Sequence, residues 1–244
     1  MGLRDLGRDV KISQRPLDII YVIDTSGSMD GAKIQSVNNA MHELETLLRD
    51  EAIKNPAAQV NIRILTFGDA QVHWHIKERT NVEQYRYNDI NYVNGSTPLG
   101  GALGVLCDIL GSDKMPSRGL KPIIVLLSDG QPNDTWEPNL DRLLSLPWGK
   151  HAIKVAIAIG KDADRDVLAR FTTDPDLVLN ANSATALQNF IKWTSTLVTH
   201  SSQRASQRDS HGNLQPRKVN VPSMLPAYDP SVDDCFVDDR RWNK

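Results

Sequence analysis

Three observations on the sequence predict an α/β protein with a doubly wound, mostly parallel sheet. Several apolar runs are short and rich in β-branched residues, such as residues 17–23, which is typical of strands buried on both faces. Between these runs, apolar residues recur at three- and four-residue steps and predict amphipathic helices. Strands that alternate with helices imply βαβ crossovers, which place helices on both faces of the sheet.

Each element is predicted from its own pattern of residues. We expect strands at the apolar runs 17–23, 60–67, 122–127, 153–159 and 177–179, and an edge strand over 72–76 after a turn at Gly68-Asp69. We expect helices at the segments of helical period 31–53, 98–110, 140–146, 164–171 and 184–198. Residues 81–94 are polar and contain tyrosines, which favours irregular structure. Together these elements predict a Rossmann-like fold with a short antiparallel edge strand.

Composition and charge argue against several classes of protein. The net charge of −2 creates no overall field that would favour nucleic acid or an anionic membrane. No stretch approaches the roughly 18 apolar residues of a membrane span, and the first residues lack the apolar core of a signal peptide. Cys107 and Cys235 have no metal-binding spacing, and nothing in their positions indicates a disulfide. We therefore expect a cytoplasmic protein that binds neither nucleic acid nor membrane.

The chain is expected to form one domain with a lead-in and a tail. We place the lead-in over residues 1–15, the domain over 16–199 and the tail over 200–244. The tail is polar and interrupted by prolines, so we expect it either to be disordered or to dock on a partner. The aspartates around Phe236 and Trp242 fit either a solvated tail or an acidic, hydrophobic docking motif.

Oxygen-bearing side chains gather at the predicted carboxyl ends of two strands. Asp24, Ser26 and Ser28 follow the first strand at alternate positions, and Asp129 follows the third buried strand. Thr97 stands at the N-cap of a predicted helix, and its loop should reach the same edge of the sheet. Carboxylates and hydroxyls suit Mg²⁺, Mn²⁺ or Ca²⁺ better than zinc, so we predict a divalent-cation site at these five residues, with Mg²⁺ the first choice. Each residue alone would serve equally well as a cap or turn residue.

Three segments carry a resemblance to a known family: Asp24-Thr25-Ser26-Gly27-Ser28-Met29, Gly95-Ser96-Thr97-Pro98-Leu99 and Leu127-Ser128-Asp129-Gly130. They look like the three loops of the metal-ion-dependent adhesion site of von Willebrand factor A-type domains, and the resemblance covers roughly residues 15–199. It implies that Ser26, Ser28 and Thr97 contact the metal. It also implies that Asp24 and Asp129 bind directly or through water, and that a partner protein's Asp or Glu completes the coordination.

Within this family the chain looks most similar to the bacterial tellurium-resistance branch, the TerY-like proteins. Three stretches carry this similarity: Asp24-Thr25-Ser26-Gly27-Ser28-Met29, Thr97-Pro98-Leu99-Gly100 and Ser128-Asp129-Gly130-Gln131-Pro132-Asn133-Asp134. The resemblance implies a protein kinase and a PP2C-type phosphatase as partners in a stress-response complex. We therefore expect an interaction module and not an enzyme.

Several alternatives stay open at the level of sequence. A metal-dependent hydrolase or phosphatase would also place Asp24 after a first strand, but the second acid that such chemistry needs two residues later is absent. The motifs of serine hydrolases and of nucleotide-binding loops are absent too. His73 and His75 share a face of the edge strand and are either solvated or a metal pair. Asp30 and Asp134 either solvate the metal loops or tune the site.

Overall fold

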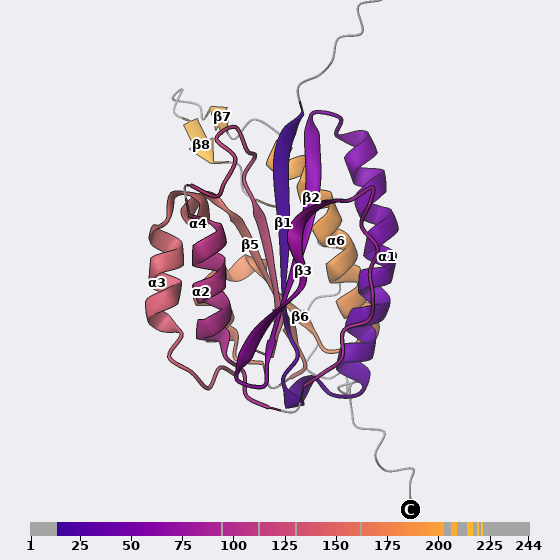
Figure 1. Cartoon of the computed structure of the whole chain (residues 1–244), viewed down its shortest axis with the longest axis vertical. Helices are drawn as coiled ribbons and strands as arrows, with labels where there is room; N and C mark the ends of the chain where they lie inside the picture. Colours follow the sequence, from indigo (N-terminus) through magenta and orange to yellow (C-terminus); the bar gives the residue numbers. More distant parts are fainter. Residues whose placement is uncertain are drawn as a thin grey trace, which may run out of the picture.

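A computed structural model describes residues 14–93, 95–111, 113–129, 131–161, 163–202, 206–208 and 214–216, with Val219 and Val221. Its centre is a six-stranded sheet of order β3-β2-β1-β4-β5-β6 (Figure 1). The strands are β1 (Arg15–Asp24), β2 (Ala58–Gly68), β3 (Gln71–Asn81), β4 (Ile123–Ser128), β5 (Ile153–Ile159) and β6 (Val178–Ala181). Neighbouring strands are parallel except β2 and β3, which are antiparallel. The predicted fold class is therefore confirmed.

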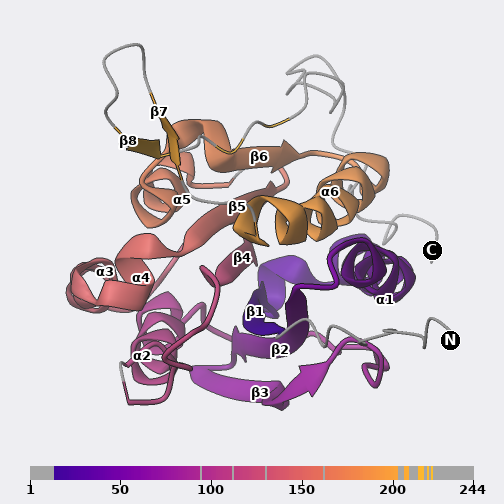
Figure 2. The ribbon, with the colours of Figure 1, turned by 90° about the horizontal axis from the view of Figure 1, so that it is seen from above.

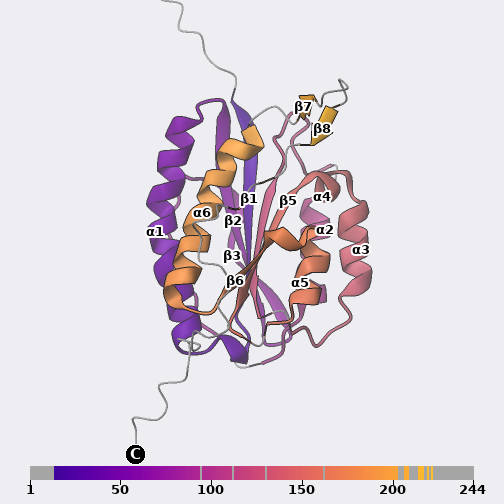
Figure 3. The same ribbon diagram turned by 180° about the vertical axis from the view of Figure 1, so that it is seen from behind.

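Helices cover both faces of the sheet, as a doubly wound fold requires (Figure 2). Side by side on one face lie α1 (Ala32–Lys54) and α6 (Ala184–Ser202). The other face carries α2 (Leu99–Ile109), α3 (Glu137–Ser145), the short α4 (Pro147–His151) and α5 (Arg165–Thr172) (Figure 3). Two 3₁₀ turns complete the domain, η1 (Gly27–Met29) and η2 (Pro175–Leu177). Among the described residues, no helix combines the length and apolar composition needed to cross a membrane.

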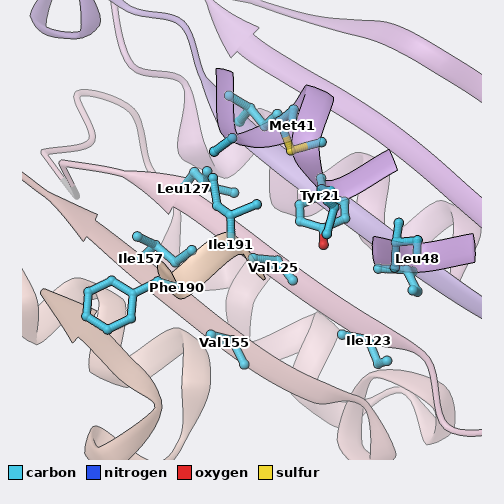
Figure 4. Packing of buried hydrophobic residues seen from close by; sticks show 14 of the residues in the cluster. Tyr21, Met41, Leu48, Ile123, Val125, Leu127, Val155, Ile157, Phe190 and Ile191 are labelled. Carbon is cyan, nitrogen blue, oxygen red and sulfur yellow. The ribbon is translucent and has the colours of Figure 1, made fainter. Parts of the chain in front are cut away.

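Each face of the sheet has its own apolar core, because successive strand residues point to opposite faces. Under α1 and α6, the strand residues Tyr21 and Val125 pack against Ile191 of α6 and its neighbours (Figure 4). Leu126 follows Val125 in β4 and belongs to the opposite cluster, together with Leu103 of α2. The central strands are apolar at consecutive positions because both of their faces are covered.

The edge strand β3 is longer than the predicted segment 72–76. A two-residue turn joins it to β2, and both turn residues, Asp69 and Ala70, have positive φ values, 49° and 58°. Pairing with β2 then continues as far as Asn81, which lies opposite Asn61. The polar residues after Ile76 hid this part of the strand, because backbone hydrogen bonds to β2 maintain it and its side chains are largely outside the core.

Residues 82–93 are irregular as predicted, yet part of this segment belongs to the core. Four of its side chains are buried in the cluster of α1 and α6: Val82, Tyr85, Tyr87 and Ile90. Side chains of α1 satisfy the backbone of the segment. The Arg49 guanidinium donates to the carbonyls of Val82 and Tyr85, and the Asn38 amide donates to the Ile90 carbonyl. These hydrogen bonds attach the segment to α1, upstream of the loop that contains Thr97.

The ends of several elements differ from the sequence predictions. The helix expected from Leu140 begins at Glu137, and α4 is an addition to the predicted elements. Helix α6 continues to Ser202, beyond the boundary expected at Thr199. The Ser201 hydroxyl donates to the Lys121 carbonyl, so the last turn of α6 is tied to the segment before β4. Tertiary contacts of this kind extend an element past the point where its apolar period stops.

Parts of the tail are described, and two of its residues contact the domain. β7 (Ser206–Arg208) and β8 (Leu214–Pro216) form an antiparallel pair. Val219 and Val221 are partly buried against the cluster of α1 and α6. The possible docking motif around Phe236 and Trp242 lies outside the described residues, as do residues 1–13.

Two isoleucines test the packing of this core. Ile191 is fully buried, whereas Ile53 at the end of α1 is 77% exposed. We expect Ile191→Ala to lower the free energy of unfolding by about 2–5 kcal/mol, because the substitution leaves a cavity. Ile53→Ala should change it by no more than about 0.5 kcal/mol. Urea unfolding followed by circular dichroism measures both, and equal effects of the two substitutions would contradict the described packing.

Candidate metal centre

The first loop of the site follows β1. Asp24 ends this strand, and its side chain is fully buried. The Ser26 amide donates to Asp24 Oδ1 at 2.9 Å, which folds the loop back toward the end of the strand. Turn η1 then brings Ser28 beside Ser26, with their hydroxyl oxygens 3.1 Å apart. Because Ser26 is buried and Ser28 is exposed, the two hydroxyls lead from the buried carboxylate to the surface.

Helix α1 begins one residue later than predicted. Gly31 was expected as its first residue, but Gly31 has a φ of 72° and α1 starts at Ala32. This left-handed conformation suits glycine because glycine has no Cβ atom. The chain therefore passes through η1 and a sharp turn between the metal loop and α1. Asp30, in this turn, is exposed, and its carboxylate accepts a hydrogen bond from the Gly31 amide.

The second loop of the site follows β4. Asp129 is only 3% exposed, and its Oδ1 accepts a hydrogen bond from the Gln131 amide. The preceding residue, Ser128, donates its hydroxyl to Asp24 Oδ2 at 2.7 Å, because β1 and β4 are neighbours. Ser128 is thus a contributor that the sequence reasoning did not select. Its signal was a hydroxyl residue directly before Asp129 at a strand end.

The two carboxylates influence each other. Burial raises the pKa of Asp24 to about 6, and the nearby Asp129 adds to the rise, while hydrogen bonds from Ser128 and Ser26 oppose it. Within the described chain, no lysine, arginine or histidine forms an ion pair with either carboxylate. Two buried like charges without a cationic partner are unfavourable, and a bound cation would offset them.

The third loop, which carries Thr97, is hydrogen-bonded to both of the other loops. Upstream, the Val93 amide donates to the Thr25 carbonyl at 2.7 Å in the first loop. Thr97 itself is bound to the second loop, because its amide donates to Asn133 Oδ1 at 3.0 Å. The structure therefore brings the three predicted loops to one edge of the sheet, the edge at which β1 and β4 end.

Thr97 is not the N-cap that the sequence predicted. Helix α2 starts at Leu99, and Pro98 occupies its N-cap position without a capping side chain. The carboxylate of Asp134 takes the role of the cap, since it accepts hydrogen bonds from the Gly100 and Gly101 amides. Thr97 is therefore not needed as a helix cap, which removes one structural reason for a threonine at this position.

The histidine pair has a different environment. His73 is exposed on β3, and the His75 ring lies 5.6 Å from the Tyr87 ring, where burial lowers the pKa of His75. Across the part of the chain that the structure describes, no three His, Cys, Asp or Glu side chains converge as a metal site would require. The proposed pair of His73 and His75 thus gains no third ligand there. A cation site in this part of the chain would need donors besides these four residue types, such as hydroxyl or carbonyl oxygens.

The donor set at the sheet edge fits a hard divalent cation. Asp24 and Asp129 supply carboxylate oxygens, and Ser26, Ser28 and Thr97 supply hydroxyl oxygens. Such oxygen donors suit Mg²⁺, Mn²⁺ or Ca²⁺. Ser28 is exposed beside the buried Ser26, so the donor set includes one hydroxyl residue that solvent reaches.

Comparison with known proteins identifies the class to which this fold and site belong. The family model of the von Willebrand factor type A domain matches residues 18–193, so the chain belongs to this family. No curated protein matches the chain.

Solved structures with the same fold come from adhesive and structural proteins. The pilus adhesin SpaC of Lactobacillus rhamnosus GG, in its open conformation, superposes with a TM-score of 0.62 at 18% identity, over 75% of this chain and 30% of the adhesin. Proximal thread matrix protein 1 of the mussel byssus superposes with a TM-score of 0.54 at 18% identity, over 76% of this chain and 48% of that protein. Another structure of the mussel protein has a zinc-occupied MIDAS motif, the abbreviation for metal-ion-dependent adhesion site. It superposes with a TM-score of 0.52 at 17% identity, over 76% of this chain and 47% of the mussel protein. This chain spans less than half of each of these proteins.

The buried Asp24 carboxylate predicts how the stability of the metal-free protein depends on pH. The pKa of Asp24 is raised from 3.8 to about 6 in the folded state, so the folded protein holds a proton more tightly than the unfolded one. Stability should therefore fall as the pH rises between these two values, by about 3 kcal/mol in all. Asp24→Asn should remove this loss and make the metal-free protein more stable at neutral pH. Urea unfolding with a chelator, from pH of about 4 to about 7.5, measures both effects.

Asp30→Asn is the matched control, since Asp30 is an exposed carboxylate near the same loop. This variant should keep the pH dependence of the parent protein. If Asp24→Asn also keeps it, Asp24 is not the buried group responsible.

Proposed function

We propose that this domain binds a divalent cation at Asp24, Ser26, Ser28, Thr97 and Asp129 and uses it to bind a protein partner through an Asp or Glu side chain. The observation that carries the proposal is the pairing of two buried carboxylates with two adjacent hydroxyls, of which Ser26 is buried and Ser28 is exposed. The bound cation, Mg²⁺ as first choice, supplies a positive centre that accepts one further oxygen ligand. Hydroxyl ligands leave much of its charge uncompensated, which favours a carboxylate from outside.

The residues of the chain have distinct parts in this proposal. Asp24 carries charge at the bottom of the site, with its orientation maintained by the Ser26 amide and the Ser128 hydroxyl. Asp129 adds the second charge, and its loop is bound through the Asp129 carbonyl to the Asp164 amide. Ser26, Ser28 and Thr97 offer neutral oxygens. The family typically provides metal-dependent modules for adhesion or protein interaction, which supports this division.

The rival function is a metal-dependent hydrolase or phosphatase. Such an enzyme needs a general acid or base within reach of the reacting group. Both oxygens of the Asp24 carboxylate already accept hydrogen bonds, from Ser26 and from Ser128, and these contacts suit a charge-bearing role better than proton transfer. We therefore favour binding over catalysis.

The finer features of the proposal rest on the sequence resemblance to tellurium-resistance proteins. We infer a cytoplasmic bacterial scaffold in a stress-response complex, with a protein kinase and a PP2C-type phosphatase as partners. The segments Thr97–Gly100 and Ser128–Asp134 support it. A binding surface for nucleic acid or membrane is not part of this proposal.

Cation binding is tested directly by thermal stability. Mg²⁺ or Mn²⁺ at about 100 times its Kd should stabilise the folded state by about 2.7 kcal/mol, because the ion binds the folded form. Thr97→Ala and Asp129→Asn should lose most of this stabilisation. Ser183→Ala is the control: the Ser183 hydroxyl accepts from the Ala186 amide and caps α6, outside the metal loops. The cation site would be refuted if no divalent ion changed the melting temperature of the parent protein.

Partner binding is tested by affinity purification with and without a chelator, read out by mass spectrometry. Proteins retained by the parent chain should be released by the chelator and should be missing with Thr97→Ala, because the cation links the two proteins. Ser183→Ala should retain them. A screen of phosphatase and esterase substrates with Mg²⁺ and Mn²⁺ examines the rival function. Turnover that disappears with Asp24→Ala would favour the hydrolase.

A further inference from the structure

Asn133 is joined to Thr97 by two hydrogen bonds. The Asn133 side-chain oxygen accepts from the Thr97 backbone amide at 3.0 Å. The Asn133 backbone amide donates to the Thr97 carbonyl at 3.3 Å. Asn133 therefore contacts both polar groups of the Thr97 backbone, whose carbonyl also accepts from the Leu99 amide at 2.9 Å. Asn133 is exposed, so its contribution to the apolar core is small. A residue that served only to solvate the loop would need neither contact.

The next residue binds the next turn of the same chain segment. The two carboxylate oxygens of Asp134 accept from the Gly100 amide at 2.9 Å and from the Gly101 amide at 3.0 Å. These amides belong to the first turn of α2, whose N-cap residue Pro98 provides no capping side chain. Asp134 thereby satisfies two donors that a local cap would otherwise have to bind.

Gly100 permits this close approach. A Cβ atom at this position would lie 2.5 Å from the Thr135 carbonyl oxygen and 2.8 Å from Asp134 Oδ2. The first turn of α2 is thus in direct contact with the loop between β4 and α3. Helix α3 also contacts Gly100, since the side-chain amide of Asn139 donates to the Gly100 carbonyl at 2.8 Å. The start of α2 is therefore held from the loop and from α3.

We infer that Asn133 and Asp134 are positioning residues of the metal centre, which set the place of Thr97 relative to Asp129. The inference rests on the proposed cation site and deepens it. Asp129 lies in the same loop as Asn133 and Asp134, so the loop that carries one ligand also holds the backbone of another. The hydrogen bonds pre-organise Thr97 before a cation binds. They reduce the ordering that binding itself would otherwise require.

The sequence allowed Asp134 either to solvate the metal loops or to tune the site, and the positioning role differs from both. Its carboxylate is occupied by the amides of α2, so it neither solvates the loop nor supplies a free charge to the cation. Asp30, the other residue beside the metal loops, binds only the adjacent Gly31 amide among the described contacts. Asn133 therefore acts on Thr97 directly, and Asp134 acts on the first turn of α2 that follows Thr97, whereas Asp30 has no described contact with either.

The test is calorimetric titration of the full chain with Mn²⁺. We expect Asn133→Ala to weaken Mn²⁺ binding about 10- to 100-fold, the range typical of residues that orient metal ligands. Asn133→Asp keeps an oxygen acceptor for the Thr97 amide and should restore most of the affinity. Asp134→Asn keeps one acceptor oxygen for the two amides of α2 and should give a smaller loss.

A matched control separates positioning from the loss of charge or of a cap. The Asp174 carboxylate accepts from the Asp176 amide and caps η2. Asp174→Asn removes a carboxylate from a cap, as Asp134→Asn does, without touching the contacts of Thr97 or Asp129. Its Mn²⁺ affinity should stay within about twofold of the parent, a change of about 0.4 kcal/mol.

A double substitution shows whether Asn133 acts through Thr97. In the Thr97→Ala background the hydroxyl to be positioned is gone, so Asn133→Ala should cause little further loss of affinity. Independent, additive losses would overturn the inference. Hydrogen exchange of the metal-free protein provides a second readout, in which Asn133→Ala should speed the exchange of the Thr97 amide.

The outcomes distinguish this inference from the proposed function. If the parent chain binds no Mn²⁺, the cation site fails and the positioning role fails with it. If the parent binds and Asn133→Ala binds equally well, with unchanged exchange at Thr97, only the positioning role is wrong. Loss with Asn133→Ala, rescue with Asn133→Asp and an unaffected Asp174→Asn together support it.

Discussion

The parallel pairing of β1 with β4 is the constraint on which the site depends. The register places Ile23 beside Leu127, so the two strands finish together and the residues that follow them meet at one edge. A hydrogen bond from the Ser128 hydroxyl to Asp24 Oδ2 links the two strand ends directly. The sheet is buried on both faces, and this rigid support lets short loops place polar side chains with little freedom.

The edge that results combines burial with negative charge. Desolvation raises the pKa of Asp24, and Asp129 adds to the effect, so the metal-free site is less favourable at neutral pH than an uncharged one would be. Residues that reduce stability and yet sit at the open edge of a parallel sheet are typical of functional sites. The proposed cation would turn this unfavourable pair into its ligands, beside the adjacent hydroxyls of the buried Ser26 and the exposed Ser28.

Family membership accounts for the fold and for the general character of the site. The pilus adhesin and the mussel matrix protein share the architecture at 17–18% identity, so very different sequences satisfy the same packing. What distinguishes one member from another must then lie in loops and attachments. Here these are the tyrosine-bearing segment fastened along α1, the Asn133 and Asp134 contacts, and a tail whose Val219 and Val221 touch the domain.

Periodicity and local motifs were enough to predict the sheet, most helices and the loops that come together, because buried strands and amphipathic helices leave their pattern in consecutive residues. The metal ligands themselves stay a prediction from the sequence. The extra length of β3, the buried Tyr85 and Tyr87, and the cap that Asp134 provides for α2 left no such pattern. Each depends on a partner far away in the chain, so only the tertiary structure could decide them: the same aspartate can solvate a loop or cap a helix, and the choice depends on which backbone amides the fold brings within reach.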